Sequence, residues 1–429
     1  MGAGGTTSRL RLEPRPACVS EARRLVRRTL VDAGCDELVD SAVLATSELV
    51  TNALVHAGTP VEVGVEILAE GVRIEIADGS RHLPERRAYG TAAGTGRGLV
   101  AVDSLVDRWG VRREGALGKV VWFELGTTGG RVVDQLSGGE FGPDSPDGIV
   151  QVRLLGVPLL VHAAWQQHVE AVLREYLLAT LDEGTGEEAI ALHAEASDAL
   201  ALLAEHLPRP ELGGGLEQMM AAALDPAASS TDATVPVPVD SVAHFASLGR
   251  ALDDAVSAAL RDVFLTPPTQ PELQAFRRWV CSQVEQQSKG APPQPWQSEE
   301  ITSWRRAPSP PGWDPAVVTN AHEPLVATDD TNTIIAVSPT AATLLGYAGP
   351  RMLVGRRLVA IVPPRYRQAH VAGFTLHLYA GRREILGHPT RLHALRQDGT
   401  EVCVELLVLA KPVEGERTVY VATLSSVEE

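Results

Sequence analysis

The stretch "LATSELVTNALVHAGTP", residues 44–60, combines the pattern of a helix with three polar side chains at a regular interval. Apolar residues at helical spacing predict one buried face: Leu44, Leu49, Ala53, Leu54 and Ala57. Gly58 predicts the end of the helix. Glu48, Asn52 and His56 would share a polar edge, because four residues is about one helical turn. An amphipathic helix with a solvated edge and a helix lining a polar site both fit this pattern, so the neighbouring sequence has to decide between them.

The sequence on either side of this helix predicts a compact set of elements. A first helix is expected over about 18–33. Strict alternation in "VEVGVEIL" (61–68) and "VRIEIADG" (72–79) predicts strands with one buried face. A glycine-rich loop leading into a helix is expected over 91–111, and a final strand in "KVVWFEL" (119–125). This order predicts an α/β sandwich with helices on one face of a largely antiparallel sheet.

Composition places the chain among soluble globular proteins of about three domains. The excess of 54 acidic over 38 basic residues lies almost entirely in residues 130–314, which carry 26 acidic and 11 basic residues. The chain has no basic patch that would neutralise phosphates, so the sequence disfavours direct nucleic-acid binding. Four scattered cysteines lack metal-ligand or disulfide spacing: Cys18, Cys35, Cys281 and Cys403. No apolar run reaches membrane-spanning length, so we expect a cytoplasmic protein without membrane contact.

Three biased stretches are predicted to be linkers: a Gly-, Ser- and Asp-rich stretch over 126–148, "PRPELGGG" (208–215) with the later "DPAASSTDATVPVPVD" (225–240), and a Pro-rich stretch over 288–315. The second interrupts the middle region. The stretches delimit three expected domains: 1–129, 149–288 and 315–429. The middle domain is predicted to be helical, and its acidic composition fits either a solvated surface or a basic partner.

The middle domain contains four segments with helical periodicity: 159–181, 187–207, 241–264 and 271–287. They suggest a four-helix bundle, formed within one chain or across a homodimer. Thr269 and Glu272 resemble a capping box that would open the last helix. A phosphoacceptor role for His168, His193 or His244 is disfavoured, because none is followed by the acidic residue and proline of a histidine-kinase dimerisation helix.

Four ordered motifs resemble one known ATP-binding domain: "SELVTNALVHAG", "IADGS", "GTGRGLVAVDSLVDRWG" and "GKVVWFEL". This Bergerat-type domain is shared by sensor histidine kinases, Hsp90-type ATPases and anti-sigma-factor serine kinases. The likeness is greatest to the actinobacterial anti-sigma-kinase branch. The resemblance implies ATP and Mg²⁺ as ligands, with a histidine kinase/Hsp90-like ATP-binding domain over residues 1–129.

The resemblance also assigns roles within these motifs. It implies that Asn52 ligates Mg²⁺, that Glu48 is the catalytic general base, and that Asp78 hydrogen-bonds the adenine amino group. The implied nucleotide-binding residues are Asn52, Asp78, Gly79, Gly94, Gly96, Arg97, Gly98 and Leu99. Such a site is chemically coherent, because Mg²⁺ accepts amide oxygens and glycines admit backbone N–H groups to phosphates.

Three positions near these motifs leave alternatives open. His56 either contacts the nucleotide or caps the helix, and Arg97 either reaches a phosphate or lies in solvent. Lys119 is expected to be a surface residue at a strand edge rather than a phosphate ligand. The family's first glycine box, D-x-G-x-G, reads "DGSRH" over 78–82 here, so both later glycines are missing where the backbone should pass close to adenine.

The C-terminal domain, 315–429, resembles a PAS sensor domain. "EPLVATDDTNTIIAVSPTAATLLGY" (323–347) predicts strand, turn, strand and short helix, and "LHALRQDGTEVCVELLVLA" (392–410) predicts a hairpin. His370 matches the haem ligand of oxygen-sensing PAS domains. A histidine on the helix surface is the favoured alternative, so we expect no haem, and the PAS ligand is unknown.

Taken together, the sequence predicts an α+β multidomain signalling protein: an α/β-sandwich ATPase, a helical middle region and an α+β PAS domain. The expected reaction is transfer of the ATP γ-phosphoryl group to a serine or threonine of an anti-anti-sigma-like partner, under control of the PAS sensor. The alternative is a non-catalytic regulator that binds nucleotide or a sigma factor.

Overall fold

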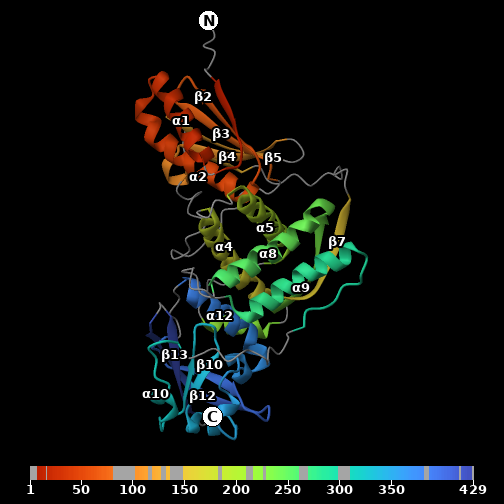
Figure 1. Cartoon of the computed structure of the whole chain (residues 1–429), viewed down its shortest axis with the longest axis vertical. Helices are drawn as coiled ribbons and strands as arrows, with labels where there is room; N and C mark the ends of the chain where they lie inside the picture. Colours follow the sequence, from red (N-terminus) through yellow and green to blue (C-terminus); the bar gives the residue numbers. More distant parts are fainter. Residues whose placement is uncertain are drawn as a thin grey trace.

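The computed structural model contains three parts that follow one another along the long axis of the molecule (Figure 1). It describes residues 7–15, 17–80, 102–114, 118–126, 132–135, 148–181, 186–208, 216–225, 229–259, 269–297, 310–380, 386–414 and 417–427. The α+β class predicted from sequence is confirmed: a sheet with helices, then a helical region, then a second antiparallel sheet.

The N-terminal part is a six-stranded sheet covered by two helices. Its elements are β1 (Thr7–Leu12), α1 (Ala17–Asp32), the 3-10 turn η1 (Asp36–Leu38), α2 (Val39–Ala57), β2 (Val61–Ile67), β3 (Val72–Asp78), β4 (Arg108–Glu114), β5 (Gly118–Leu125) and β6 (Val132–Gln135). The strand order is β1-β2-β3-β5-β4-β6, and all neighbours are antiparallel except β4 and β6. The expected sandwich is therefore confirmed. Three strands were not predicted: β1, β4, which begins in the last four residues of the expected loop-and-helix segment 91–111, and β6 within the expected linker.

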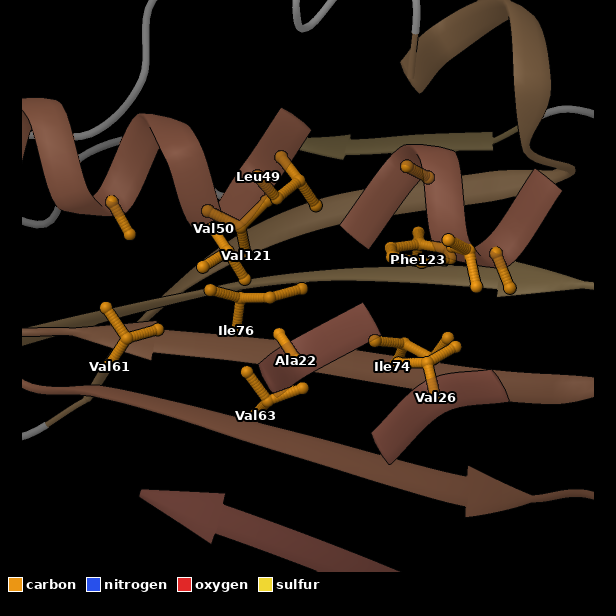
Figure 2. Close-up of a cluster of buried hydrophobic side chains, with 14 of the residues drawn as sticks. Ala22, Val26, Leu49, Val50, Val61, Val63, Ile74, Ile76, Val121 and Phe123 are labelled. Atoms are coloured by element: carbon orange, nitrogen blue, oxygen red, sulfur yellow. The ribbon is translucent and has the colours of Figure 1, made fainter. Parts of the chain in front are cut away.

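The helix α2 packs its apolar face on the centre of this sheet. Leu49 and Val50 lie over Ile76 and Val121 (Figure 2), and all four side chains are buried. Each such burial contributes about 1.5–3 kcal/mol to folding. The helix has the length and hydropathy of a membrane span over residues 36–55, but half of that segment is buried inside the protein. The prediction that Leu44 belongs to the buried stripe is wrong: the residue is 48% exposed.

The opposite face of the sheet carries charges instead. Arg73 pairs with Glu75 at 3.1 Å and with Glu124 at 3.0 Å. Its guanidinium also lies 4.1 Å above the ring of Trp122. This division of polar and apolar residues between the two faces produces the period-two pattern seen in the sequence.

The middle part contains the four predicted helices and a strand pair. Its elements are β7 (Ile149–Pro158), α4 (Leu159–Leu181), α5 (Gly186–His206), α6 (Leu216–Leu224), β8 (Ser230–Pro238), the turn η2 (Val239–Ser241), α8 (Val242–Ala259) and α9 (Pro271–Ser288). The strands β7 and β8 are antiparallel, so residues 230–238 are a strand where composition predicted an irregular interruption. Part of the predicted Pro-rich linker is also packed: the backbone N–H of Trp296 donates to the carbonyl oxygen of Leu155 at 2.9 Å.

The predicted capping box at the start of α9 is wrong. The helix begins at Pro271, and the N-cap residue Gln270 makes no side-chain capping bond. The Oγ1 atom of Thr269 instead lies 2.6 Å from Nε2 of His168. Glu272 points to the C-terminal part of the protein, where it pairs with Arg357 at 2.8 Å.

The C-terminal part is a five-stranded antiparallel sheet in the order β10-β9-β13-β12-β11. Its elements are α10 (Ala316–Thr319), β9 (Leu325–Thr328), β10 (Ile334–Val337), α11 (Pro339–Leu344), η3 (Pro350–Met352), η4 (Leu358–Ile361), η5 (Pro364–Tyr366), α12 (Arg367–Ala380), β11 (Thr390–Leu395), β12 (Glu401–Pro412) and β13 (Thr418–Ser426). The strand, turn, strand and helix expected over 323–347 are present, and so is the hairpin, which turns at Gly399 with φ of 85°. The Asp/Asn turn between β9 and β10 places Asn332 at φ 62°.

Two interfaces connect these parts. The helix α5 packs against α2, and Leu177, Ala189 and Ile190 join the core of the N-terminal sheet. On the other side, α12 packs against α4 through small apolar residues that include Ala163, Ala164, Ala369 and Ala372. The helical region therefore contacts both sheets, as Figure 1 shows for α5 and α12.

A substitution in the turn after α2 can test the contact between α2 and α5. Gly58 has φ of 58°, and a Cβ atom added there would lie 2.3 Å from Cβ of Ala194. Gly34 has a similar φ of 72° but no atom within 4 Å of an added Cβ. We expect Gly34→Ala to cost about 1 kcal/mol from the left-handed backbone alone. Gly58→Ala should cost about 1–3 kcal/mol more, because it also overpacks the interface.

Urea unfolding of the two variants measures this difference. In a double-mutant cycle with Ala194→Gly, the added cost of Gly58→Ala should shrink. Equal costs for Gly34→Ala and Gly58→Ala would contradict the packing of α5 on this turn.

Candidate functional site

A buried ion pair lies where β3 ends. Asp78 follows Ile76 on the helix-covered face of the strand, and its side chain is only 2% exposed. Lys119 on β5 stands opposite Asp78 in the strand register. Its Nζ atom lies 3.1 Å from Oδ1 of Asp78, and its side chain is 9% exposed. The expectation of a surface residue at a strand edge is therefore wrong for Lys119: β5 lies between β3 and β4, and the ammonium is buried.

The surroundings of this pair are energetically unfavourable for charge. Burial lowers the pKa of Lys119 from its ordinary value of 10.5, while the charge of Asp78 and the hydrogen bond to it oppose this shift. Removing two charges from water costs several kcal/mol per ion, and their attraction offsets this only in part. A buried pair at the open end of a strand is therefore a candidate polar binding position.

Thr59 connects the end of β3 to α2. The backbone N–H of Gly79 donates to Oγ1 of Thr59 at 2.8 Å. A Cβ atom at position 79 would lie 2.9 Å from Cγ2 of Thr59, so glycine allows this close approach. The backbone N–H of Ser80 donates to Oδ1 of Asp78 at 2.8 Å. The first residues after β3 are thus held by the turn that ends α2.

The polar edge of α2 lies beside this strand end. Glu48 and Asn52 are both half-buried, and they flank Leu49, which packs over Ile76 (Figure 2). Within the described ranges, neither polar side chain makes a hydrogen bond or ion pair. Glu48 and Asn52 therefore lie on the helix that packs over β3, without a partner among the described residues, whereas Oδ1 of Asp78 at the end of β3 is already engaged by Lys119 and Ser80.

Several predicted site residues lie outside the described residues: Gly94, Gly96, Arg97, Gly98 and Leu99. The backbone of His56 is helical, but its side chain is also outside the described set. The described part of the site is consequently the α2 edge, the end of β3 and the start of β5.

The far side of α2 is held by a histidine of the middle region. Nδ1 of His193 donates to the carbonyl oxygen of Val55 at 2.8 Å, in the last turn of α2, where carbonyl groups lack helical partners. Burial lowers the pKa of His193 to about 4, so the ring is neutral. His168 is also buried, and His244 pairs with Asp198 at 2.6 Å. All three histidines are thus engaged in contacts within the protein.

The contacts at the junction with the C-terminal part were not predicted. Arg357 is 2% exposed and donates from Nη2 to Glu272 and to Gln270, both at 2.8 Å. Next to them, Nδ2 of Asn332 donates to Nε2 of His370 at 2.7 Å. His370 is half-buried on α12, and burial lowers its pKa to about 4. The sequence contained no local signal for these contacts, because the partners are far apart in the chain.

Comparison with known proteins assigns the N-terminal part. Residues 12–125 match the family model of the histidine kinase-like ATPase domain, which implies ATP binding there. No curated protein matches the chain.

Among solved structures, the matches include three PAS domains. One is from an HTR-like protein of Haloarcula marismortui, with 20% identity, 26% of this chain and 88% of that chain covered, and a TM-score of 0.21. Another is from a two-component sensor histidine kinase. Its identity is 17%, the match covers 26% of this chain and 92% of that chain, and the TM-score is 0.21. The third is from Colwellia psychrerythraea, with 16% identity, 26% and 91% covered, and a TM-score of 0.22.

Buried neutral histidines make the stability of the fold depend on pH. The pKa is lowered from 6.5 to about 3 in His168 and to about 4 in His193. The unfolded chain binds these protons more tightly, so their stabilisation is present above pH 6.5 and is lost as the pH falls towards 4. At pH 5, His193 alone should account for up to about 2 kcal/mol of lost stability.

Urea unfolding between pH 8 and pH 5 tests this dependence. His193→Gln keeps a donor for Val55 and should flatten the acid side of the profile, whereas the exposed His322→Gln should leave it unchanged. An identical slope for His193→Gln and the wild type would show that His193 is not held neutral.

Proposed function

We propose that this chain is a cytoplasmic, ATP-dependent protein serine/threonine kinase whose partner is an anti-anti-sigma-like regulator. The observation that carries the proposal is the placement of Glu48 and Asn52 on α2, the helix that packs on β3, and of Asp78 at the end of β3, where Gly79 is hydrogen-bonded to the turn after α2. All three lie within the residues that match the ATPase domain. The acidic net charge of −16 supports a protein partner rather than a nucleic acid or an anionic membrane surface.

The available side chains suit an adenine nucleotide. The buried carboxylate of Asp78 would accept a hydrogen bond from the exocyclic amino group of the base. The amide oxygen of Asn52 would hold Mg²⁺, which neutralises phosphate charge when bound. Glu48 lies one helical turn away, where its carboxylate would take the proton from the partner's hydroxyl group. Positioning and electrostatics would account for most of such a phosphoryl transfer.

A second candidate is a regulator that binds nucleotide or a sigma factor without catalysis. Two observations favour it. The segment after Asp78 lacks the two later glycines of the family pattern, and Lys119 already pairs with the carboxylate that would receive the base. The missing glycines would weaken nucleotide binding, and the pair with Lys119 leaves only Oδ2 of Asp78 for the base; neither feature removes Glu48 or Asn52.

We propose in addition that the C-terminal part is a PAS sensor that acts on the kinase through the helical region. The order of its elements and its five-stranded antiparallel sheet support this assignment. The connection would run from the Arg357–Glu272 pair to the helical region and from α5 to the last turn of α2. A change at the PAS domain would then move the helix that carries Glu48 and Asn52.

Substitutions on α2 separate the kinase from the regulator. Asn52→Ala removes a metal ligand, so it should weaken Mg·ATP binding and abolish transfer together. Glu48→Gln removes the base but no nucleotide contact, so binding should stay within a few-fold while transfer slows by roughly 10²–10⁴. Thr51→Ala, on the exposed side of the same helix, is the matched control.

Binding is measured by titrating a fluorescent ATP analogue, and transfer by labelled ATP with proteins captured from native lysate. If the wild-type chain binds ATP but labels no captured protein, the regulator replaces the kinase. Wild-type transfer by Glu48→Gln would remove Glu48 from the role of base.

Arg357 tests the coupling between the PAS domain and the kinase. Arg357→Gln breaks a buried pair, and we expect transfer to change by roughly 5- to 150-fold, the usual size of an allosteric coupling. The affinity of Arg357→Gln for ATP should stay within a few-fold of the wild-type value. Its neighbour Arg356 is exposed, so Arg356→Gln should leave both unchanged.

Because Arg357→Gln also risks destabilising the fold, Glu272→Gln serves as a second variant on the other side of the same contact. Circular dichroism establishes that both variants are folded. If both fold and transfer at the wild-type rate, this contact does not transmit a signal.

A further inference from the structure

The Asp78–Lys119 pair presents a hydrogen-bond acceptor and a donor side by side. Their side chains stand opposite each other on β3 and β5 and point to the helix-covered face. The two described contacts of the carboxylate, with Nζ of Lys119 and with the N–H of Ser80, both fall on Oδ1. Oδ2 is therefore the oxygen that remains to receive a donor from a ligand.

The position of Lys119 calls for an explanation beyond stability. Replacing a buried ion pair by apolar residues is often neutral or stabilising, so packing alone gives no reason for a lysine here. The next inward-facing residues on the same two strands, Ile76 and Val121, are apolar and buried. The charge is confined to the end of the strands, where the site lies.

The edge of adenine that carries the amino group and N1 is complementary to the Asp78–Lys119 pair. Its exocyclic amino group is a donor, and the adjacent ring nitrogen N1 is an acceptor. The amides of Asn and Gln use the same pairing of acceptor and donor on the other side of the amino group, where they bind N6 and N7 of adenine. An aspartate and a lysine 3.1 Å apart offer the same two groups, with a charge on each.

We propose that Lys119 is a specificity-determining residue that donates a hydrogen bond to N1 of adenine, while Oδ2 of Asp78 accepts one from the amino group. This inference rests on the proposed nucleotide site. The lysine then serves in both states of the protein: it neutralises Asp78 when the base is absent and reads the base when it is bound. A lysine that only neutralised Asp78 would be indifferent to the presence of N1.

The test removes the donor and the acceptor separately. The full chain and its Lys119→Met variant are titrated with ATP and with 1-deaza-ATP, which lacks the N1 acceptor. We expect the wild type to prefer ATP by roughly 10- to 100-fold, because hydrogen bonds to charged groups contribute about 1.5–3 kcal/mol. Lys119→Met should bind the two ligands equally, so the double-mutant cycle returns the coupling between Nζ and N1.

Matched controls exclude indirect effects. The analogue 7-deaza-ATP keeps N1 and should bind the wild type like ATP. Lys289→Met removes an exposed lysine of the helical region and should keep the preference for ATP. Lys119→Gln restores a neutral donor and should recover part of the preference, which guards against a folding defect in Lys119→Met.

The outcomes are distinct. Equal discrimination against 1-deaza-ATP by the wild type and Lys119→Met overturns the inference and leaves the nucleotide site intact. Tighter binding of GTP than of ATP by the wild type overturns the assignment to adenine. A wild-type chain that binds none of these nucleotides overturns the proposed function itself, and the inference with it.

Discussion

The packing of α2 on the centre of the N-terminal sheet is the interaction on which the rest of the structure depends. Leu49 and Val50 hold the helix over Ile76 and Val121, and this contact sets the height and rotation of the helix. Because Glu48 and Asn52 belong to the same turns, their position relative to the strand ends follows from apolar burial alone. Among the described residues, Glu48 and Asn52 make no hydrogen bond or ion pair that would hold the helix in place.

The C-terminal end of α2 contacts two different parts of the protein. The chain leaves its C-terminal end through Gly58 and reaches Thr59, whose hydroxyl accepts a hydrogen bond from Gly79 at the end of β3. The same last turn receives His193 from the helical region. The last turn of α2 thus contacts both the end of β3, through Thr59, and α5, through His193.

The sequence was most informative where burial is one-sided. Strict alternation identified β2 and β3, and helical periodicity identified α1, α2 and the four main helices of the middle region. It failed for β4, whose residues 108–111 end the segment expected to be a loop and helix, and for β8, whose prolines suit an edge strand but whose composition is typical of a linker.

Contacts between residues far apart in the chain were the second feature that could not be predicted from the sequence. Lysine is rarely buried, so Lys119 was expected at the surface, and only the register of β3 and β5 reveals that it faces Asp78. Arg357 and Glu272 belong to different parts of the chain and give no periodic signal. Of the candidate site, the sequence therefore supplied Glu48, Asn52 and Asp78 but not the partner of Asp78.

The contribution of α4 and α5 to the N-terminal core bears on how this chain can be divided. Leu177, Ala189 and Ile190 complete a hydrophobic cluster that otherwise belongs to the first 125 residues. A fragment that ended at residue 129 would expose the apolar surface that these side chains cover, together with the last turn of α2. A boundary chosen from composition would separate the N-terminal core from the side chains of α4 and α5 that pack on it. A fragment that extends through α5 keeps this cover, so the packed unit is larger than the 12–125 match to the ATPase family model.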